Sequence, residues 1–242
     1  MTKPLQNIKN GYVISDLHMF TKWTSVDKYM CDIRKAAGKA DFFVFNGDIF
    51  DFRWSTLGSA SKTAEFAIKW FHDICREFPE CTFVYILGNH DAHCAILEPL
   101  AEFSDKQNNF IWHNSFIKIG SSLFMHGDLI FAMRTTSPFK REKYKRRNPV
   151  RSVIRKTYHR VIKMGAHNLV SRLHAKERCA KYVLQVLEKG HSHKLEGVTD
   201  IYIGHTHVGF SDYKYRGYTF HNSGSAVHDL HCNMMRVRND TL

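Results

Sequence analysis

Five short apolar runs, each ending in polar residues that can bind metal or move protons, constrain this chain more than any other feature. The runs are GYVIS, DFFVFN, CTFVYIL, SSLFM and DIYI, and they lead into DLH, GDIFD, GNHD, HGD and GHTH. Short apolar runs bounded by glycine and polar residues are typical of buried strands. The sequence therefore predicts five sets of polar side chains at strand ends.

Helical patterns separate the first three runs. Residues 24–37 are predicted to be helical, and residues 61–77 carry apolar side chains at helical spacing. Alternation of strand and helix predicts an α/β fold with a mostly parallel sheet covered by helices. Residues 110–125 are predicted to form two strands joined by a Gly-Ser turn, and residues 210–238 to form antiparallel strands.

The basic charge is concentrated in one segment. Residues 133–190 carry 17 Lys and Arg against three acids, so this segment is +14 in a chain of net charge +12. Residues 137–187 within it are predicted to be helical, with a break near Asn148-Pro149. We expect a basic helical cap at 133–190, inserted into a core formed by 1–132 and 191–242. Such a patch favours an anionic partner, and a solvated helical face is the alternative.

Composition places the chain among soluble globular proteins. Of its 242 residues, 43% are hydrophobic and 24% are charged, and no apolar run reaches the roughly 18 residues of a membrane-spanning helix. The six cysteines form no CxxC pair, which argues against a structural zinc knuckle and fits reduced thiols. We therefore expect a cytoplasmic protein, with peripheral contact to a membrane as an option. We expect no obligate protein partner.

The polar residues at the strand ends predict a centre with two metal ions. Ligands of open α/β sheets bind beyond the carboxyl ends of the strands, so these groups should converge. Carboxylates, imidazoles and an amide oxygen suit divalent ions such as Mn²⁺, Fe or Zn²⁺. Seven candidates are too many for one open catalytic site and suit two ions that share a carboxylate. The candidates are Asp16, His18, Asp48, Asn89, His126, His205 and His207.

The five motifs together resemble the calcineurin-like metallophosphoesterases, over about residues 11–226, and NSGS at 222–225 resembles a further stretch of that family. The resemblance implies a metallophosphoesterase-type α/β sandwich and two divalent ions, with Mn²⁺ preferred and Fe or Zn²⁺ as alternatives. It implies that Asp48 bridges the ions. One ion would be held by Asp16, His18, Asp48 and His207, and the other by Asp48, Asn89, His126 and His205.

The resemblance also assigns roles around His90. This imidazole would face the substrate and either stabilise charge on the phosphoryl oxygens or protonate the leaving oxygen. Asp91 would orient His90, or would serve only the turn in which it lies. Asp51 and Asp128 would support the ligands from behind. Glycines that precede Asp48, Asn89 and His205 would allow close approach of the backbone.

The layout with its helical basic insertion is similar to that of the UDP-2,3-diacylglucosamine pyrophosphohydrolases. That family cleaves a pyrophosphate bond at the membrane surface, here by attack of metal-bound hydroxide. Arg53 and Arg134 would reach a second phosphate. His90 departs from the family, which has Arg at this position.

The alternative is a phosphodiesterase acting on nucleic acid or nucleotides, to which KREKYKRRNPVRSVIRK would supply phosphate contacts. A binding scaffold without catalysis is a third class. The presence of all seven ligands argues against it.

Overall fold

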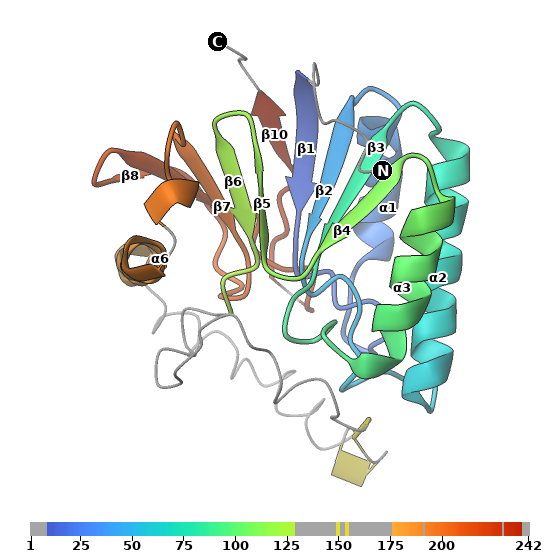
Figure 1. The fold of residues 1–242 in the computed structure, drawn as a ribbon. Helices are drawn as coiled ribbons and strands as arrows, with labels where there is room; N and C mark the ends of the chain where they lie inside the picture. The colour runs from blue at the N-terminus through green and yellow to red at the C-terminus, as the bar shows by residue number, and fades with distance from the viewer. Residues whose placement is uncertain are drawn as a thin grey trace.

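The protein is a sandwich of two five-stranded sheets with helices on both outer faces (Figure 1). The computed structural model describes residues 9–128, 149–150, 153–154, 176–190, 192–228 and 230–238. The order of strands is β10-β1-β2-β3-β4 in the first sheet and β5-β6-β7-β9-β8 in the second. This arrangement confirms the predicted α/β sandwich.

The first sheet is parallel except for one edge strand. Strands β1 (Asn10–Ile14), β2 (Phe42–Asn46), β3 (Thr82–Ile86) and β4 (Phe110–His113) run parallel, and β10 (Met235–Arg238) pairs antiparallel with β1. The helices α1 (Asp27–Ala37), α2 (Ala60–Glu77) and α3 (Cys94–Lys106) cover its outer face. The three loops that follow β1, β2 and β3 therefore emerge side by side.

The apolar sequence of the first sheet follows from burial on both faces. Along β2, Phe43 and Phe45 pack with the helices, whereas Phe42 and Val44 pack against the second sheet. Successive side chains of a strand point to opposite faces, so a strand covered on both faces must be apolar at every position. This is why DFFVFN reads as a continuous run.

The second sheet is mixed. It contains β5 (Phe116–Ile119), β6 (Ser122–Met125), β7 (Asp200–Ile203), β8 (Phe210–Tyr215) and β9 (Tyr218–Asn222). Strands β6, β7 and β9 run parallel, while β5 and β8 are antiparallel to their neighbours. Helix α6 (Lys176–Gly190) packs on its outer face, and the short 3-10 helix η2 (Ser192–Lys194) follows. The predicted antiparallel pairing in residues 210–238 is confirmed for β8 with β9 and for β10 with β1.

Two sequence predictions differ from the structure. Residues 110–125 form three strands instead of two, because the chain leaves the first sheet after β4 and starts the second at β5. The predicted Gly-Ser turn, at Gly120 and Ser121, joins β5 and β6. Helix α3 was not predicted. It buries Ile96, Leu100 and Phe103 at helical spacing and contains Pro99.

The predicted cap falls mostly outside the described residues. Its last part is α6, whose buried Ala180, Val183 and Leu184 pack against the second sheet, so this helix is a layer of the core. The assignment of the whole of 133–190 to a cap is wrong at this end, and its remainder stays a prediction. Among the helices that the structure describes, none has the length and apolar content needed to cross a bilayer.

Candidate metal centre

The loops after β1, β2, β3, β6 and β7 meet at one end of the sandwich, where backbone hydrogen bonds connect them. The Asp16 N–H donates to the Gly47 carbonyl at 3.0 Å, and the Gly204 N–H donates to the His126 carbonyl at 2.9 Å. The second bond joins two strand-end loops within the second sheet. The polar residues of all five motifs are thereby brought to one place, as the sequence predicts.

Backbone strain is concentrated at the candidate ligands. Five of the seven have positive φ: Asp16 (55°), His18 (47°), Asp48 (51°), His205 (67°) and His207 (58°). Non-glycine residues seldom adopt this region, and clusters of such residues are typical of functional sites. The loops are held in conformations that aim side chains inward at a cost to local stability.

Glycines allow these loops to approach one another. A Cβ added to Gly88 would overlap the carboxylate of Asp48, and one added to Gly204 would overlap that of Asp16. Gly47 has φ +85° and lies against the His126 ring. The predicted close approach is confirmed, because any side chain at these positions would displace a candidate ligand.

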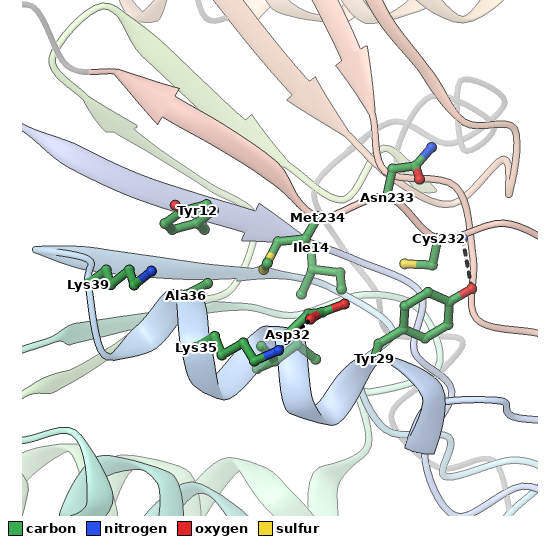
Figure 2. Close-up of a pocket in the computed structure, with 11 residues that line it drawn as sticks. Tyr12, Ile14, Tyr29, Asp32, Lys35, Ala36, Lys39, Cys232, Asn233 and Met234 are labelled. Carbon is green, nitrogen blue, oxygen red and sulfur yellow. Dashed lines mark hydrogen bonds and ion pairs between the residues drawn. The ribbon is translucent and has the colours of Figure 1, made fainter.

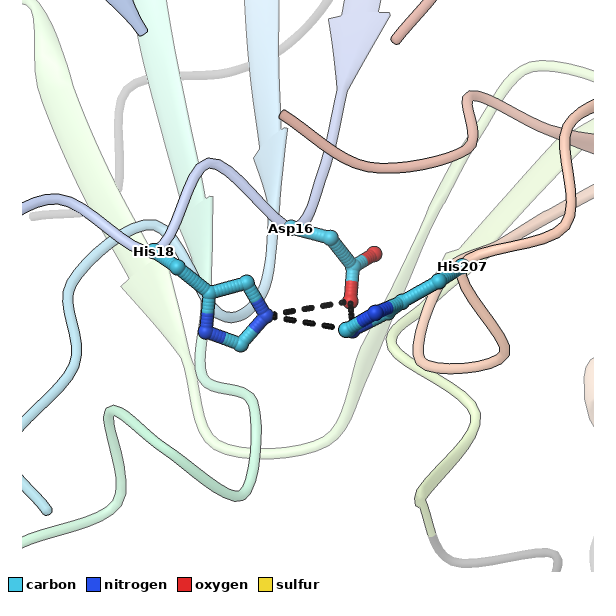
Figure 3. A group of neighbouring side chains, drawn as sticks. All are labelled: Asp16, His18 and His207. Atoms are coloured by element: carbon cyan, nitrogen blue, oxygen red, sulfur yellow. Dashed lines mark hydrogen bonds and ion pairs between the residues drawn. The ribbon is translucent and has the colours of Figure 1, made fainter. Parts of the chain in front are cut away.

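A first group of ligand atoms contains Asp16, His18 and His207 (Figure 3). The His18 Nε2 lies 3.1 Å from the His207 Nε2 and 3.9 Å from the Asp16 Oδ1. The His207 Nε2 lies 3.3 Å from the same oxygen. Three donor atoms thus face a common point, and His207, 29% exposed, is on the open side.

A second group contains Asp48, His126 and His205, whose ligand atoms lie within 4.8 Å of one another. The Asp48 Oδ2 lies 3.1 Å from the His126 Nε2 and 4.0 Å from the His18 Nε2 of the first group. Its other oxygen accepts the N–H of His90 at 2.7 Å. One carboxylate oxygen of Asp48 therefore faces both groups, which is the position a bridging ligand requires.

Two of the imidazoles, His18 and His126, are oriented as metal ligands are. The His18 Nδ1 lies 3.2 Å from the Asp51 carboxylate, and the His126 Nδ1 lies 3.1 Å from the Asn46 carbonyl. A ligating histidine commonly donates its other N–H to a carboxylate or carbonyl, which leaves the facing nitrogen free to bind. Asn46 is not predicted from the sequence, because its role here comes from its backbone carbonyl and leaves no side-chain signal.

The side-chain oxygen of Asn89 also fits a metal site. The Oδ1 of Asn89 is buried and has no hydrogen-bond partner among the described residues. A buried polar atom without a partner is costly, and a cation would satisfy it. Oxygen and imidazole donors in such a set suit Mn²⁺, Fe and Zn²⁺ alike.

Electrostatics prepares several donors for metal. Burial opposes the charged form of Asp48, but the neighbouring His126 and His90 outweigh it, and the pKa of Asp48 falls well below its usual value. Burial and the nearby His126 lower the pKa of His205 to about 4, so its ring is neutral at pH 7. Burial also opposes the charge of His126, yet Asp48 and Asp16 raise its pKa to about 10. Without metal, the His126 proton compensates the carboxylates.

The acid beside His90 is Asp51, and the prediction that Asp91 orients this ring is wrong. The His90 Nδ1 lies 2.9 Å from the Asp51 Oδ2. Burial opposes protonation of His90, but Asp51 and Asp48 raise its pKa to about 9. Asp91 instead accepts the backbone N–H groups of Phe50 at 2.8 Å, Gly88 at 3.1 Å and Ile49 at 3.3 Å. Asp91 therefore joins the loops after β2 and β3. This is the structural role in the turn that the sequence allows as the alternative to orienting His90.

The remaining candidates lie around these groups. Arg53 follows Asp51 closely, its N–H donates to that carboxylate at 3.0 Å, and its guanidinium lies 5.9 Å from the centre of the Trp54 ring. Asp128 is buried beyond β6 and acts on the charge of His126 and His205. Arg134 lies outside the described residues.

A comparison with protein families agrees with this geometry. The sequence profile of the calcineurin-like phosphoesterases matches residues 12–209. A search of curated protein sequences finds no match to the chain. A solved structure of a dimetal phosphatase from Danio rerio aligns with 96% of this chain and 92% of its own, at 11% identity and a TM-score of 0.48. From the profile match, this chain belongs to the calcineurin-like phosphoesterase family and is a metal-dependent phosphoester hydrolase.

Proposed function

We propose that the seven candidate ligands hold two divalent ions and that the chain hydrolyses a phosphodiester or pyrophosphate bond there. The observation that carries this proposal is the Asp48 Oδ2, which lies within 4.0 Å of imidazole nitrogens of both groups. Asp16, His18 and His207 would complete one site, and Asn89, His126 and His205 the other. Mn²⁺ is the ion we propose first, with Fe or Zn²⁺ as alternatives.

The ions, when bound, would activate water at neutral pH and neutralise charge on the phosphoryl oxygens. His90 would act on the substrate directly, because its side chain is 25% exposed and its Nδ1 lies 2.9 Å from the Asp51 carboxylate. Before metal binds, and despite burial, Asp51 and Asp48 raise the pKa of this ring to about 9, which favours its protonated form at pH 7. A protonated imidazole can stabilise a phosphoryl oxygen or donate its Nε2 proton to the leaving oxygen.

For the substrate, we propose a lipid-linked pyrophosphate of the UDP-2,3-diacylglucosamine kind. Support comes from apolar surface beside the centre. Phe20, two residues after His18, stacks on Phe50 with the ring centroids 5.5 Å apart. The Phe66 ring lies edge-on to Phe20 with the centroids 6.3 Å apart, and Phe66 is 46% exposed. An acyl chain could pack against these aromatic side chains. Arg53, and Arg134 from the basic segment, would bind the second phosphate.

The same proposal includes peripheral contact with an anionic membrane. The segment 133–190 carries the +14 charge, and two of its described residues, Val153 and Ile154, are 72% and 54% exposed. Cations together with exposed aliphatic side chains favour binding at a lipid surface.

A phosphodiesterase acting on nucleic acid or nucleotides is the second candidate. It is favoured by His90, which stands where the pyrophosphohydrolases have Arg, and by the density of cations in KREKYKRRNPVRSVIRK. Binding to a phosphate backbone releases counterions, so hydrolysis of nucleic acid at limiting substrate should fall steeply with added salt.

The two proposals can be compared directly with three substrates. With Mn²⁺ present, we would measure hydrolysis of UDP-2,3-diacylglucosamine in detergent, a simple aryl phosphodiester and single-stranded DNA. Preference for the lipid by orders of magnitude would support the first proposal. Preference for DNA would support the second.

Loss of all three activities in Asp48→Ala, with activity retained in Asp73→Ala on the exposed face of α2, would tie the reaction to the metal centre. Full activity of Asp48→Ala would contradict the proposed bridging ligand.

A further inference from the structure

A cavity of about 450 Å³ lies between α1, β1 and residues 232–234 (Figure 2). None of the residues that line it is a candidate metal ligand. Its volume is within the range of sites that bind small molecules. The cavity lies on the helix-covered side of the first sheet, where Tyr12, Tyr29 and Met234 pack beside the core.

The lining has an apolar floor and a charged rim. Ile14, Ile33 and Ala36 are buried at the floor. Lys35 on α1 and Lys39, two residues beyond the end of this helix, line the rim, and Asp32 lies 3.8 Å from the Lys35 Nζ. The charged residues of the lining are therefore one acid and two cations. An apolar floor with a net positive rim suits a small molecule that has an apolar body and one negative charge.

Residues 232–234 connect the cavity to the loop that carries Asp16. The Cys232 N–H donates to the Tyr29 hydroxyl at 3.3 Å, as the dashed line in Figure 2 marks. The Asn233 N–H donates to the Ser223 carbonyl at 2.7 Å, and the Ser223 hydroxyl accepts the Ser15 N–H at 3.0 Å. A few hydrogen bonds thus separate the cavity wall from a candidate metal ligand.

The neighbouring residues strengthen this connection. The Ser225 hydroxyl donates to the Asp16 carbonyl at 3.0 Å, and the Ala226 N–H donates to the same oxygen at 3.0 Å. The NSGS stretch at 222–225 therefore ties the Asp16 backbone to the segment that forms the cavity wall. Anything that orders residues 232–234 should also order this loop.

We propose that this cavity binds a small amphipathic anion, an aromatic or aliphatic body with one carboxylate or phosphate, and that the bound anion stabilises the Asp16 loop. The proposal goes beyond hydrolysis at the metal centre. It concerns a second ligand, in a cavity between α1 and β1 and not at the strand ends where the metal centre lies.

Phenylbutyrate and phenylbutylamine form a suitable pair of probes, because they share one apolar body and carry opposite charges. With the methionine methyl groups labelled by ¹³C, Met234 reports from the cavity and Met30 from elsewhere on α1. Phenylbutyrate should shift the Met234 methyl signal saturably, with a dissociation constant on the order of 1 mM for a ligand of this size. The signal is assigned with Met234→Leu. No saturable shift at ten times that concentration would overturn the site, and equal affinity for phenylbutylamine would overturn the assignment of charge.

Two variants test the lining. Ala36→Trp should fill the cavity and abolish the shift. Lys35→Ala with Lys39→Ala, both at exposed positions that should not affect folding, should weaken binding of phenylbutyrate up to about fivefold. Lys28→Ala, exposed on α1 and outside the lining, should leave it unchanged. Unchanged binding in the double lysine variant would contradict the proposed rim.

Amide hydrogen exchange tests the connection independently. Phenylbutyrate at ten times its dissociation constant should slow exchange of the Asn233 and Ser15 amides by up to about tenfold, if opening requires release of the ligand. The Thr219 amide, bonded to the Thr199 carbonyl at 2.8 Å in the second sheet, should not change. Binding without slower exchange at Ser15 would overturn the proposed effect on the Asp16 loop.

Discussion

The first sheet brings every candidate oxygen ligand to the metal centre, whereas the second brings only imidazoles. Asp16, Asp48 and Asn89 follow β1, β2 and β3, together with His18. His126, His205 and His207 follow β6 and β7. The group of Asp16, His18 and His207 and the group of Asp48, His126 and His205 each combine residues from both sheets. The centre therefore lies across the interface between the two sheets, which we call the seam. Binding of metal should reinforce the packing of one sheet on the other.

The seam is also organised without metal. The side-chain amide of Asn46, at the end of β2, donates to the Met125 carbonyl at 3.1 Å and to the Tyr202 carbonyl at 3.2 Å across the sheets. The Asn46 carbonyl faces the His126 Nδ1. Carboxylates from one sheet lie against imidazoles from the other, so the charges partly balance before an ion binds. We expect the empty centre to be preformed, in keeping with its strained backbone.

Asp48→Ala should have the largest effect, because one Asp48 oxygen faces both groups. Loss of a bridging ligand should remove several kcal/mol of charge stabilisation and lower turnover of an aryl phosphodiester at least about a thousandfold. Metal content by mass spectrometry should fall together with activity, while circular dichroism stays native. Retention of two tightly bound ions would show that the sheets are not joined through this carboxylate.

His207→Ala separates the two groups. His207 belongs only to the first group and is partly exposed, so its loss should weaken one ion and leave the other bound. The expected metal content is one ion per chain under dialysis conditions in which the native protein keeps two. Loss of both ions at once would mean that the groups bind cooperatively and that the two sheets cannot be treated separately.

Asp51→Asn and Asp91→Asn compare two buried acids of neighbouring loops. The Asp51 Oδ2 contacts the rings of His18 and His90, so the Asn variant should lower turnover about 10- to 100-fold. The Asp51 Oδ1 accepts the Arg53 and Trp54 N–H groups, which an Asn oxygen can still accept, so little stability should be lost. Asp91 accepts three backbone N–H groups, so its Asn variant should cost about 1–3 kcal/mol of unfolding free energy. Turnover and urea unfolding distinguish them, and the reverse pattern would support Asp91 as the acid that orients His90.

The contrast between these acids shows what sequence could predict. The motifs identified the strand ends because each motif is local, with its ligands directly after an apolar run. Asp51 and Asp91 look equivalent, since each lies two or three residues beyond a candidate ligand. Their directions depend on positive φ at Asp48 and on contacts between loops, such as the Phe52 N–H to the His90 carbonyl at 3.1 Å. Contacts of this kind depend on the tertiary structure, so the local sequence does not reveal them.

The prediction for residues 110–125 failed for the same physical reason. Nothing local in FIWHNSFIKIG indicates that β4 joins the first sheet and β5 the second, because each strand is defined by partners distant in sequence. Helix α3 could have been found from the spacing of its buried residues, although Pro99 inside the pattern weakened that signal.

Asn46→Ala should give the smallest of these effects and addresses the seam itself. Removal of its amide leaves two buried carbonyls without that donor, at a cost of about 1–3 kcal/mol. Asn109→Ala is the matched variant, because the Asn109 amide donates to the Cys75, Phe78 and Cys81 carbonyls far from the seam. Both should lower the unfolding free energy, measured in urea. Only Asn46→Ala should also weaken binding of Mn²⁺, measured by calorimetry, since only Asn46 joins the sheets that share the ions. Equal Mn²⁺ affinity in the two variants would show that metal binding does not depend on the packing of the sheets at Asn46.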